Sequence, residues 1–267
     1  MIALPYLTAL RFSGADAGDF LHNQLSADVL ALSSGQSVFG CYCEPKGRVL
    51  ALMLVGRAGD EYHAVMSAEL VQSIAQRLKI FVLRSQVTIE VRYDTAVFGS
   101  DKADGASQVN GTAMGFSQPG NGNCYLLLDQ TMQKTSQESH SDWKVSELQR
   151  GLCWLGVATS GQFLPQMLGF DQLGAVNYRK GCYPGQEIVA RTHYLGKVKR
   201  HPRYLRTNAQ LDLEPMEKIN IHGHSGAHEA VVVDLANQPG IGSSLLLVTR
   251  MDPDLEALQI EYRDQVV

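Results

Sequence analysis

The chain has 267 residues, of which 45% are hydrophobic, and a formal net charge of −4. This length exceeds one average domain and supplies enough apolar side chains for two or three compact units. A general nucleic-acid-binding protein usually carries an overall positive charge, so the net negative charge argues against this class of protein. No apolar run approaches the ~20 residues of a membrane-spanning helix, so we expect no membrane partner. Five unevenly spaced cysteines and an N-terminus without a targeting signal favour a cytoplasmic protein without a disulfide framework.

The first hundred residues predict an α+β pattern. An aspartate before an apolar helical pattern predicts a short capped helix that begins near Asp16. Apolar side chains at helical spacing predict a second helix over residues 68–83. The strands expected here cover residues 37–44, 48–55, 61–66 and 87–91, and Pro45-Lys46-Gly47 is the turn between the first two.

The remaining segments differ in composition. Residues 99–123 are rich in Gly, Ser, Asn and Asp, which predicts long loops, and residues 130–142 are polar and compatible with a helix. Short apolar runs separated by turn residues follow from Arg203 onward. They predict strands over residues 218–222, 229–235, 244–250 and 255–262, which together indicate an all-β module at the end of the chain.

One short run, from Lys180 to Glu187, combines a cation, a thiol, an aromatic ring, an amide and a carboxylate. Its two glycines and one proline predict a turn that presents side chains rather than a regular helix or strand. Cys182 lies between cationic and glycine-rich neighbours, an environment that favours a reactive thiol. The alternative is an inert buried thiol.

Four segments carry a resemblance to a known family. They are residues 20–28, 45–48 and 159–168, and the run KGCYPGQEIVAR over residues 180–191. Together they resemble the YgfZ-type folate-binding proteins, which are relatives of the glycine-cleavage T-protein, an aminomethyltransferase. The resemblance spans roughly residues 8–205.

This resemblance implies an α+β fold arranged as a GcvT-like and YgfZ-like three-part ring around a folate pocket. Residues 1–195 would form the folate-binding domain, in two halves of about 1–47 and 110–195. The halves would enclose a ferredoxin-like α+β insertion over about 48–109, and residues 196–267 would form a small C-terminal β-barrel.

The resemblance also implies which residues line the pocket. Gln186 and Glu187 would hydrogen-bond the pterin edge, and Lys180 and Arg191 would neutralise the glutamyl tail. Trp143 would stack on the ligand, although a core position is the alternative for this ring. Structural ion pairs remain open for Lys180 and Arg191. The full set is Trp143, Gln166, Lys180, Tyr183, Gln186, Glu187 and Arg191. The second aromatic ring expected near the N-terminus is replaced by Leu7, with Tyr6 beside it.

One absence bears on catalysis. T-proteins carry a catalytic aspartate on the strand after the glycine-containing hairpin turn, whereas residues 48–54 contain no acid here. The resemblance therefore favours a tetrahydrofolate-binding accessory protein, which supports assembly or repair of iron–sulfur enzymes and thereby tRNA methylthiolation. Its partners would be folate and iron–sulfur enzymes or their assembly factors, with any effect on tRNA indirect.

Two other functions stay open at this point. The first is a folate-dependent aminomethyl transferase or demethylase that uses another acid or base. The second is direct tRNA binding through residues 191–206, which contain six Lys and Arg residues and no acid. Solvation of a strand edge, which protects against aggregation, is the alternative for these cations. We assign no metal site, because Cys41 and Cys43 alone are too few for an iron–sulfur cluster.

Overall fold

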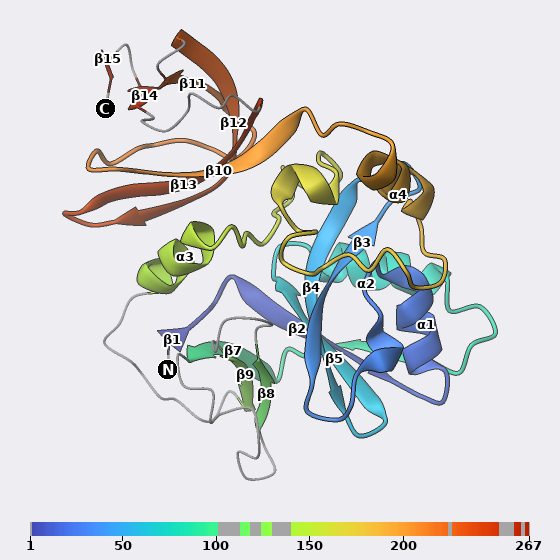
Figure 1. Cartoon of the computed structure of the whole chain (residues 1–267). Coiled ribbons are helices and arrows are strands. Elements are labelled where there is room, and N and C mark those ends of the chain that lie inside the picture. The colour runs from blue at the N-terminus through green and yellow to red at the C-terminus, as the bar shows by residue number, and fades with distance from the viewer. Residues whose placement is uncertain are drawn as a thin grey trace.

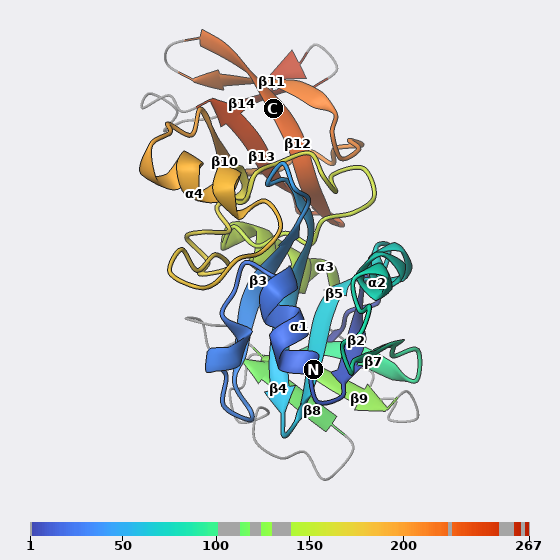
Figure 2. The same cartoon turned by 90° about the vertical axis from the view of Figure 1, so that its right-hand side faces the viewer.

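Three antiparallel sheets organise the chain in the computed structural model, which describes residues 2–100, 113–117, 124–129, 140–223, 226–250, 259–262 and 265–266 (Figures 1 and 2). Helix α3 (His140–Gln149) packs against the C-terminal sheet on one side and β1 (Ile2–Ala3) on the other. No helix in the described ranges is long and apolar enough to cross a membrane.

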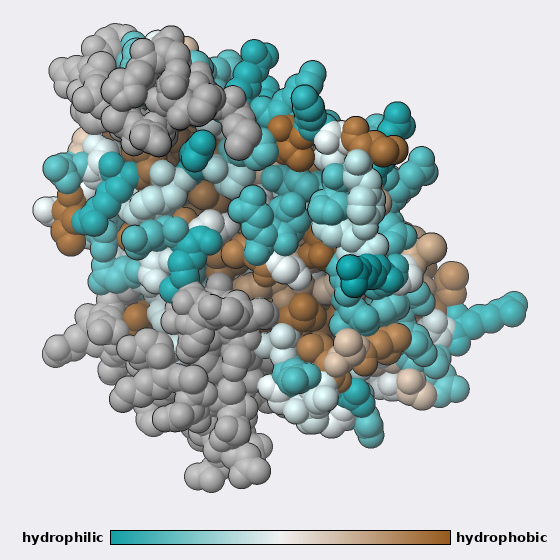
Figure 3. Space-filling model, viewed as in Figure 1, coloured by the Kyte–Doolittle hydropathy of each residue, from teal (hydrophilic) through white to brown (hydrophobic). Residues whose placement is uncertain are grey.

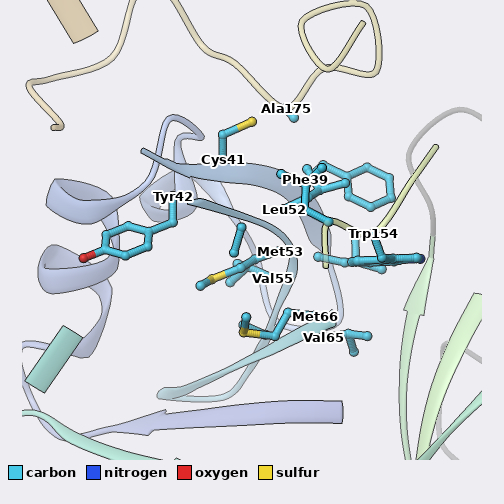
Figure 4. Close-up of a cluster of buried hydrophobic side chains, with 14 of the residues drawn as sticks. Phe39, Cys41, Tyr42, Leu52, Met53, Val55, Val65, Met66, Trp154 and Ala175 are labelled. Atoms are coloured by element: carbon cyan, nitrogen blue, oxygen red, sulfur yellow. The ribbon is translucent and has the colours of Figure 1, made fainter. Parts of the chain in front are cut away.

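The first sheet has the strand order β3-β4-β5-β2-β6. These strands are β2 (Leu7–Ser13), β3 (Ser37–Cys43), β4 (Val49–Ala58), β5 (Glu61–Ser67) and β6 (Thr88–Val91). β4 is an almost continuous apolar run and is buried along most of its length, as expected of a strand covered on both faces. Figure 4 shows Phe39 beside Trp154 and the Cys41 sulfur directed toward Ala175.

Two helices pack on this sheet, and both were predicted. α1 (Ala17–Gln24) contacts β5, and α2 (Val71–Ile80) contacts β2 and β6. The expected side-chain cap of α1 is wrong. The Asp16 carboxylate makes no cap bond and instead accepts a 2.7 Å hydrogen bond from the backbone N–H of Gln86. That bond ties the start of α1 to the segment before β6.

The second sheet has the order β1-β7-β9-β8, with β7 at Thr95–Ser100, β8 at Ala113–Ser117 and β9 at Cys124–Asp129. The prediction of loops throughout residues 99–123 is therefore wrong for β8 and for the end of β7. The strand pairing of β9 with both neighbours outweighs the local turn composition. Residues 101–112, 118–123 and 130–139 lie outside the described residues.

The C-terminal sheet has the order β10-β13-β12-β11-β14-β15. Its strands are β10 (Arg200–Thr207), β11 (Lys218–Gly223), β12 (Gly226–Gln238), β13 (Gly242–Arg250), β14 (Gln259–Tyr262) and β15 (Gln265–Val266). The all-β prediction is confirmed for the described residues of this module, and β10 is an additional strand. Residues 255–258 of the expected last strand lie outside the described residues. The pairings among the described strands leave β10 and β15 at opposite edges, so they do not show a closed barrel.

The structure differs from the expected domain layout at residue 48. β3 and β4 form one antiparallel hairpin on either side of that boundary, and β5 and β2 continue the same sheet. Residues 49–91 therefore share their sheet with residues 7–43 instead of forming a separately folded insertion.

Two glycine turns from distant parts of the sequence pack against each other. Gly47 in the β3–β4 turn has a φ of 77°, and Gly185 at the start of α4 (Gln186–Tyr194) has a φ of 81°. A Cβ atom on Gly185 would lie 2.4 Å from the Glu44 carbonyl oxygen and 2.6 Å from the Gly47 Cα. Only glycine fits this approach without a shift of the backbone.

We predict that Gly185→Ala lowers the free energy of unfolding by at least ~2 kcal/mol more than Gly174→Ala. Gly174 has a φ of 75° but open space around its Cβ position, so its substitution measures backbone strain alone. Urea denaturation of the two variants provides the comparison. Equal losses would show that the contact between the two turns contributes nothing.

Candidate functional site

Lys180 joins the motif turn to the end of α1. Its ammonium group donates hydrogen bonds to the carbonyl oxygens of His22 and Leu25, the second at 2.7 Å. It also lies 5.1 Å from the centre of the Tyr183 ring. Carbonyls at a helix C-terminus carry partial negative charge and lack intrahelical partners, so a cation here caps the helix.

Burial changes the pKa of the Lys180 ammonium group and of the neighbouring His22. Lys180 is 9% exposed, and burial lowers its pKa to about 8. Burial, followed by the charge of Lys180, also lowers the pKa of His22, whose Nδ1 lies 3.2 Å from Asp28 Oδ1. Two of the three N–H donors of Lys180 are therefore used by carbonyl oxygens inside the protein, and its role as a counterion for a folate tail stays a prediction.

The rest of the motif turn is held by its own side chains. Tyr183 is buried, and the Gln186 amide donates to the carbonyl oxygens of Lys180 and Gly181, both at 3.4 Å. Cys182, between these anchors, is exposed. The turn therefore presents a thiol to solvent from a fixed backbone.

The other described thiols are of a different kind. Cys41, Cys43 and Cys153 are buried, and burial raises the pKa of Cys41 to about 12. Burial also raises the pKa values of Cys43 and Cys153. Cys182 is thus the accessible thiol among these four. The described residues contain no group of three or more His, Cys, Asp or Glu side chains placed to hold a metal ion.

Helix α4 carries two of the predicted site residues on its surface. Glu187 is exposed in its first turn and Arg191 is exposed in its last turn. Gln166, from the short helix η3 (Pro165–Leu168), is buried and donates to the Val189 carbonyl at 2.8 Å and to the Tyr178 hydroxyl at 3.2 Å. Gln166 therefore holds α4 through the Val189 carbonyl on the buried side of the helix, and its side chain is not exposed to solvent.

Trp143 belongs to a separate buried cluster around Glu147. Its indole N–H donates to Glu147 Oε1 at 3.1 Å, and Trp154 donates to the same oxygen at 3.0 Å. Tyr125 donates to this oxygen at 2.5 Å, while Tyr6 donates to Oε2 at 2.9 Å. Burial raises the pKa of Glu147, although these four donors favour its charged form.

The structure therefore does not bring Trp143 to the motif turn. Its ring is 6% exposed and packs over Gly99, and Leu7 is likewise buried. The core alternative for Trp143 is the one observed, which differs from the expected stacking role. Sequence reasoning missed Glu147, although its position four residues after Trp143 on one helix was a usable signal.

α3 also links the cluster to the C-terminal sheet. Lys144 forms an ion pair with Asp234 at 2.7 Å, and Gln238 donates to Asp142 at 2.6 Å. Figure 3 shows hydrophobic residues near the centre of this face, between the C-terminal sheet and the first sheet. Neither Lys144 nor Asp234 was predicted as a contact residue.

Comparisons with known proteins show which sequences and which fold this chain resembles. The tRNA-modifying protein YgfZ of Colwellia psychrerythraea is 26% identical over 225 residues, covering 75% of this chain and 69% of the relative. The tRNA-modifying protein YgfZ of Yersinia pestis is 27% identical over 237 residues, covering 78% and 71%. The resemblance to the YgfZ-type proteins is confirmed.

Further matches cover more of the chain. An uncharacterized protein of Haemophilus influenzae is 26% identical over 262 residues, covering 97% of this chain and 91% of its own length. The glycine cleavage system aminomethyltransferase T from Bartonella henselae has a similar fold, with a TM-score of 0.70 and 14% identity over 99% of this chain and 82% of that one. No protein-family model matches the chain.

The buried lysine leads to a pH-dependent prediction. The folded-state pKa of Lys180, about 8, lies below its ordinary value of 10.5. Between these values the unfolded chain binds more protons, so the free energy of unfolding should rise with pH. We predict that wild type gains ~1–3 kcal/mol over this range relative to Lys180→Met.

Denaturant unfolding at a series of pH values measures this difference. Lys79→Met is the matched control, because Lys79 is exposed on α2 and its difference curve should stay flat. A flat curve for Lys180→Met as well would contradict the lowered pKa.

Proposed function

We propose that the protein binds a reduced folate and acts as an accessory protein in tRNA modification, by supporting the assembly or repair of iron–sulfur enzymes. The observation that carries this proposal is the exposed Cys182 thiol on a turn fixed by Lys180 and Gln186. The relatives named tRNA-modifying proteins cover about three quarters of the chain and support the tRNA part.

An accessory role is favoured over aminomethyl transfer. The solved aminomethyltransferase shares the fold, but β4 has the sequence VLALMLVGRA and contains no carboxylate. The T-protein resemblance leads us to expect the catalytic aspartate on this strand. A positioned acid or base typically contributes ~10²–10⁴-fold to a rate, so its loss weighs against turnover.

The surface of α4 offers chemistry that suits a folate. A carboxylate such as Glu187 can accept two N–H bonds from the amino-pyrimidine edge of a pterin. Arg191 can pair with the carboxylates of a glutamyl tail. Neither side chain has an ion-pair partner among the described residues, so both are available to an extended ligand that lies along α4. A bound reduced folate would supply a one-carbon unit, and Cys182 would supply a nucleophilic sulfur.

We predict that Glu187→Ala weakens binding of both 5-formyltetrahydrofolate and tetrahydropteroate by ~1–3 kcal/mol, because a charge-assisted hydrogen bond to the pterin is lost. Arg191→Ala should weaken only the first ligand, since tetrahydropteroate has no glutamate. Isothermal titration calorimetry of each variant with each ligand measures both effects.

Arg84→Ala is the control, since Arg84 is exposed and lies outside α4. Its affinities should match those of wild type. Unchanged affinity in both α4 variants would show that folate does not bind at this surface. If the wild-type protein binds neither of the two ligands, the folate proposal as a whole is refuted.

We predict that Cys182→Ser abolishes support of tRNA methylthiolation in cells that lack the native protein, while folate affinity stays within a few-fold of wild type. The serine hydroxyl is similar in size to the cysteine thiol but is a far weaker nucleophile at neutral pH. Mass spectrometry of modified nucleosides measures the effect in cells.

Alkylation of the folded protein provides the control for thiol access. Iodoacetamide should label Cys182 rapidly, and should label Cys41, Cys43 and Cys153 only after unfolding. Full complementation by Cys182→Ser would refute the reactive-thiol role.

A further inference from the structure

The chain from the end of α4 into β10 concentrates positive charge on an otherwise acidic protein. Residues 188–206 contain no Asp or Glu, whereas the whole chain has a net charge of −4. The exposed cations of this segment are Arg191, Lys197, Lys199, Arg200 and Arg206. Figure 1 shows α4 followed directly by the connection to β10.

These cations are not neutralised within the part of the chain that the structure describes. Arg11, Arg92, Lys144 and Lys218 each form an ion pair with a carboxylate. No such pair involves the cations of residues 191–206 in the described ranges. Their charge therefore remains available to an external anion.

Aromatic rings lie beside this charge. Tyr178 and His193 are stacked, with ring centroids 3.8 Å apart and an interplanar angle of 16°. Tyr194, 63% exposed, meets the His193 ring edge-on at 4.7 Å. His193 is exposed as well.

The rings are held in place from beneath. The Tyr178 hydroxyl accepts a hydrogen bond from Gln166, which also binds the Val189 carbonyl inside α4. The backbone N–H groups of Leu195 and Gly196 both donate to the Arg191 carbonyl and close the end of the helix. Gln166 therefore ties the Tyr178 ring to α4, and the backbone bonds to Arg191 define where the helix ends and the lysine-containing segment begins.

We propose that the surface formed by Tyr178, Arg191, His193, Tyr194, Lys197, Lys199 and Arg200 binds RNA through unpaired nucleotides. Cations bind successive phosphates, and exposed rings stack on bases, which is how single-stranded segments of RNA are held. An acidic protein partner could pair with the cations of this surface but would leave the exposed ring faces without a stacking partner. A membrane surface would require a broader apolar face than Tyr194 and Leu195 provide. Arg191 is the one residue that this surface shares with the proposed folate site, and the other six residues belong to the RNA surface alone.

A labelled RNA stem–loop, and the same stem as a loopless duplex, serve as probes in fluorescence anisotropy at several salt concentrations. Wild type should bind the stem–loop about tenfold more tightly than the duplex, because only the loop offers bases for stacking. Lys197→Gln/Lys199→Gln should weaken binding at least about fivefold and reduce the slope of log affinity against log salt by about 1.4 units, since each lost cation contributes about 0.7 for a single strand. Tyr194→Ala should weaken binding about tenfold with the slope unchanged.

The matched control is Lys79→Gln/Arg84→Gln, which removes the same charge from another exposed region and should stay within twofold of wild type. Loss of binding in this control, or equal affinity for loop and duplex, would overturn the proposal. Binding to phosphatidylserine vesicles in place of RNA would also overturn it. Calorimetry with 5-formyltetrahydrofolate, unchanged in these variants, separates failure here from failure of the folate proposal.

Discussion

The close contact between the two glycine turns at Gly47 and Gly185 fixes the geometry on which the candidate site depends. Gly185 is the residue before α4, so its position sets where that helix begins. Ile188, in the first turn of α4, packs over Gly47, since a Cβ there would lie 3.1 Å from the Ile188 Cβ. The β3–β4 hairpin therefore determines where α4 begins. The same contact holds the turn that carries the exposed thiol of Cys182, two residues before Pro184.

Two buried charges connect distant segments in different ways. Lys180 is satisfied by carbonyl oxygens at the end of α1, more than 150 residues earlier in the chain. Glu147 is satisfied by four N–H and O–H donors from strands, loops and its own helix. Removing one partner from such a group leaves a buried polar atom without its hydrogen bond, so each contact favours the observed arrangement of the segments it joins.

The sequence predicted most of the local structure because its signals are local. The hairpin around Pro45 and the helix α2 follow from turn residues and periodicity, and both are present. The role of Lys180 could not be read in the same way, because its carbonyl partners lie more than 150 residues away in sequence. Trp143 has a near hydrogen-bond partner in Glu147, but the residues that bury its ring, Gly99 and Tyr125, are distant in sequence. A lysine in a glycine-rich motif suggests an exposed anion site, and only the folded chain places α1 carbonyls against it. Sheet pairing also crosses residue 48, where the sequence pattern changes, and such pairing cannot be read from local signals.

Both proposed activities use one short helix and share Arg191 in its last turn, which constrains how they relate. α4 has nine residues, so its ends are about 13 Å apart at 1.5 Å per residue. Glu187 lies at its N-terminal end, and Arg191 and His193 lie at its C-terminal end, the placement that complements a helix dipole. This charge order stabilises α4 itself, so it is no proof of ligand binding. The cations beyond the helix, from Lys197 to Arg200, gain nothing from the dipole, because its effect falls off within the last turn. Their unpaired exposure is therefore not explained by the stability of α4, and it is these residues that give the RNA surface its independent basis.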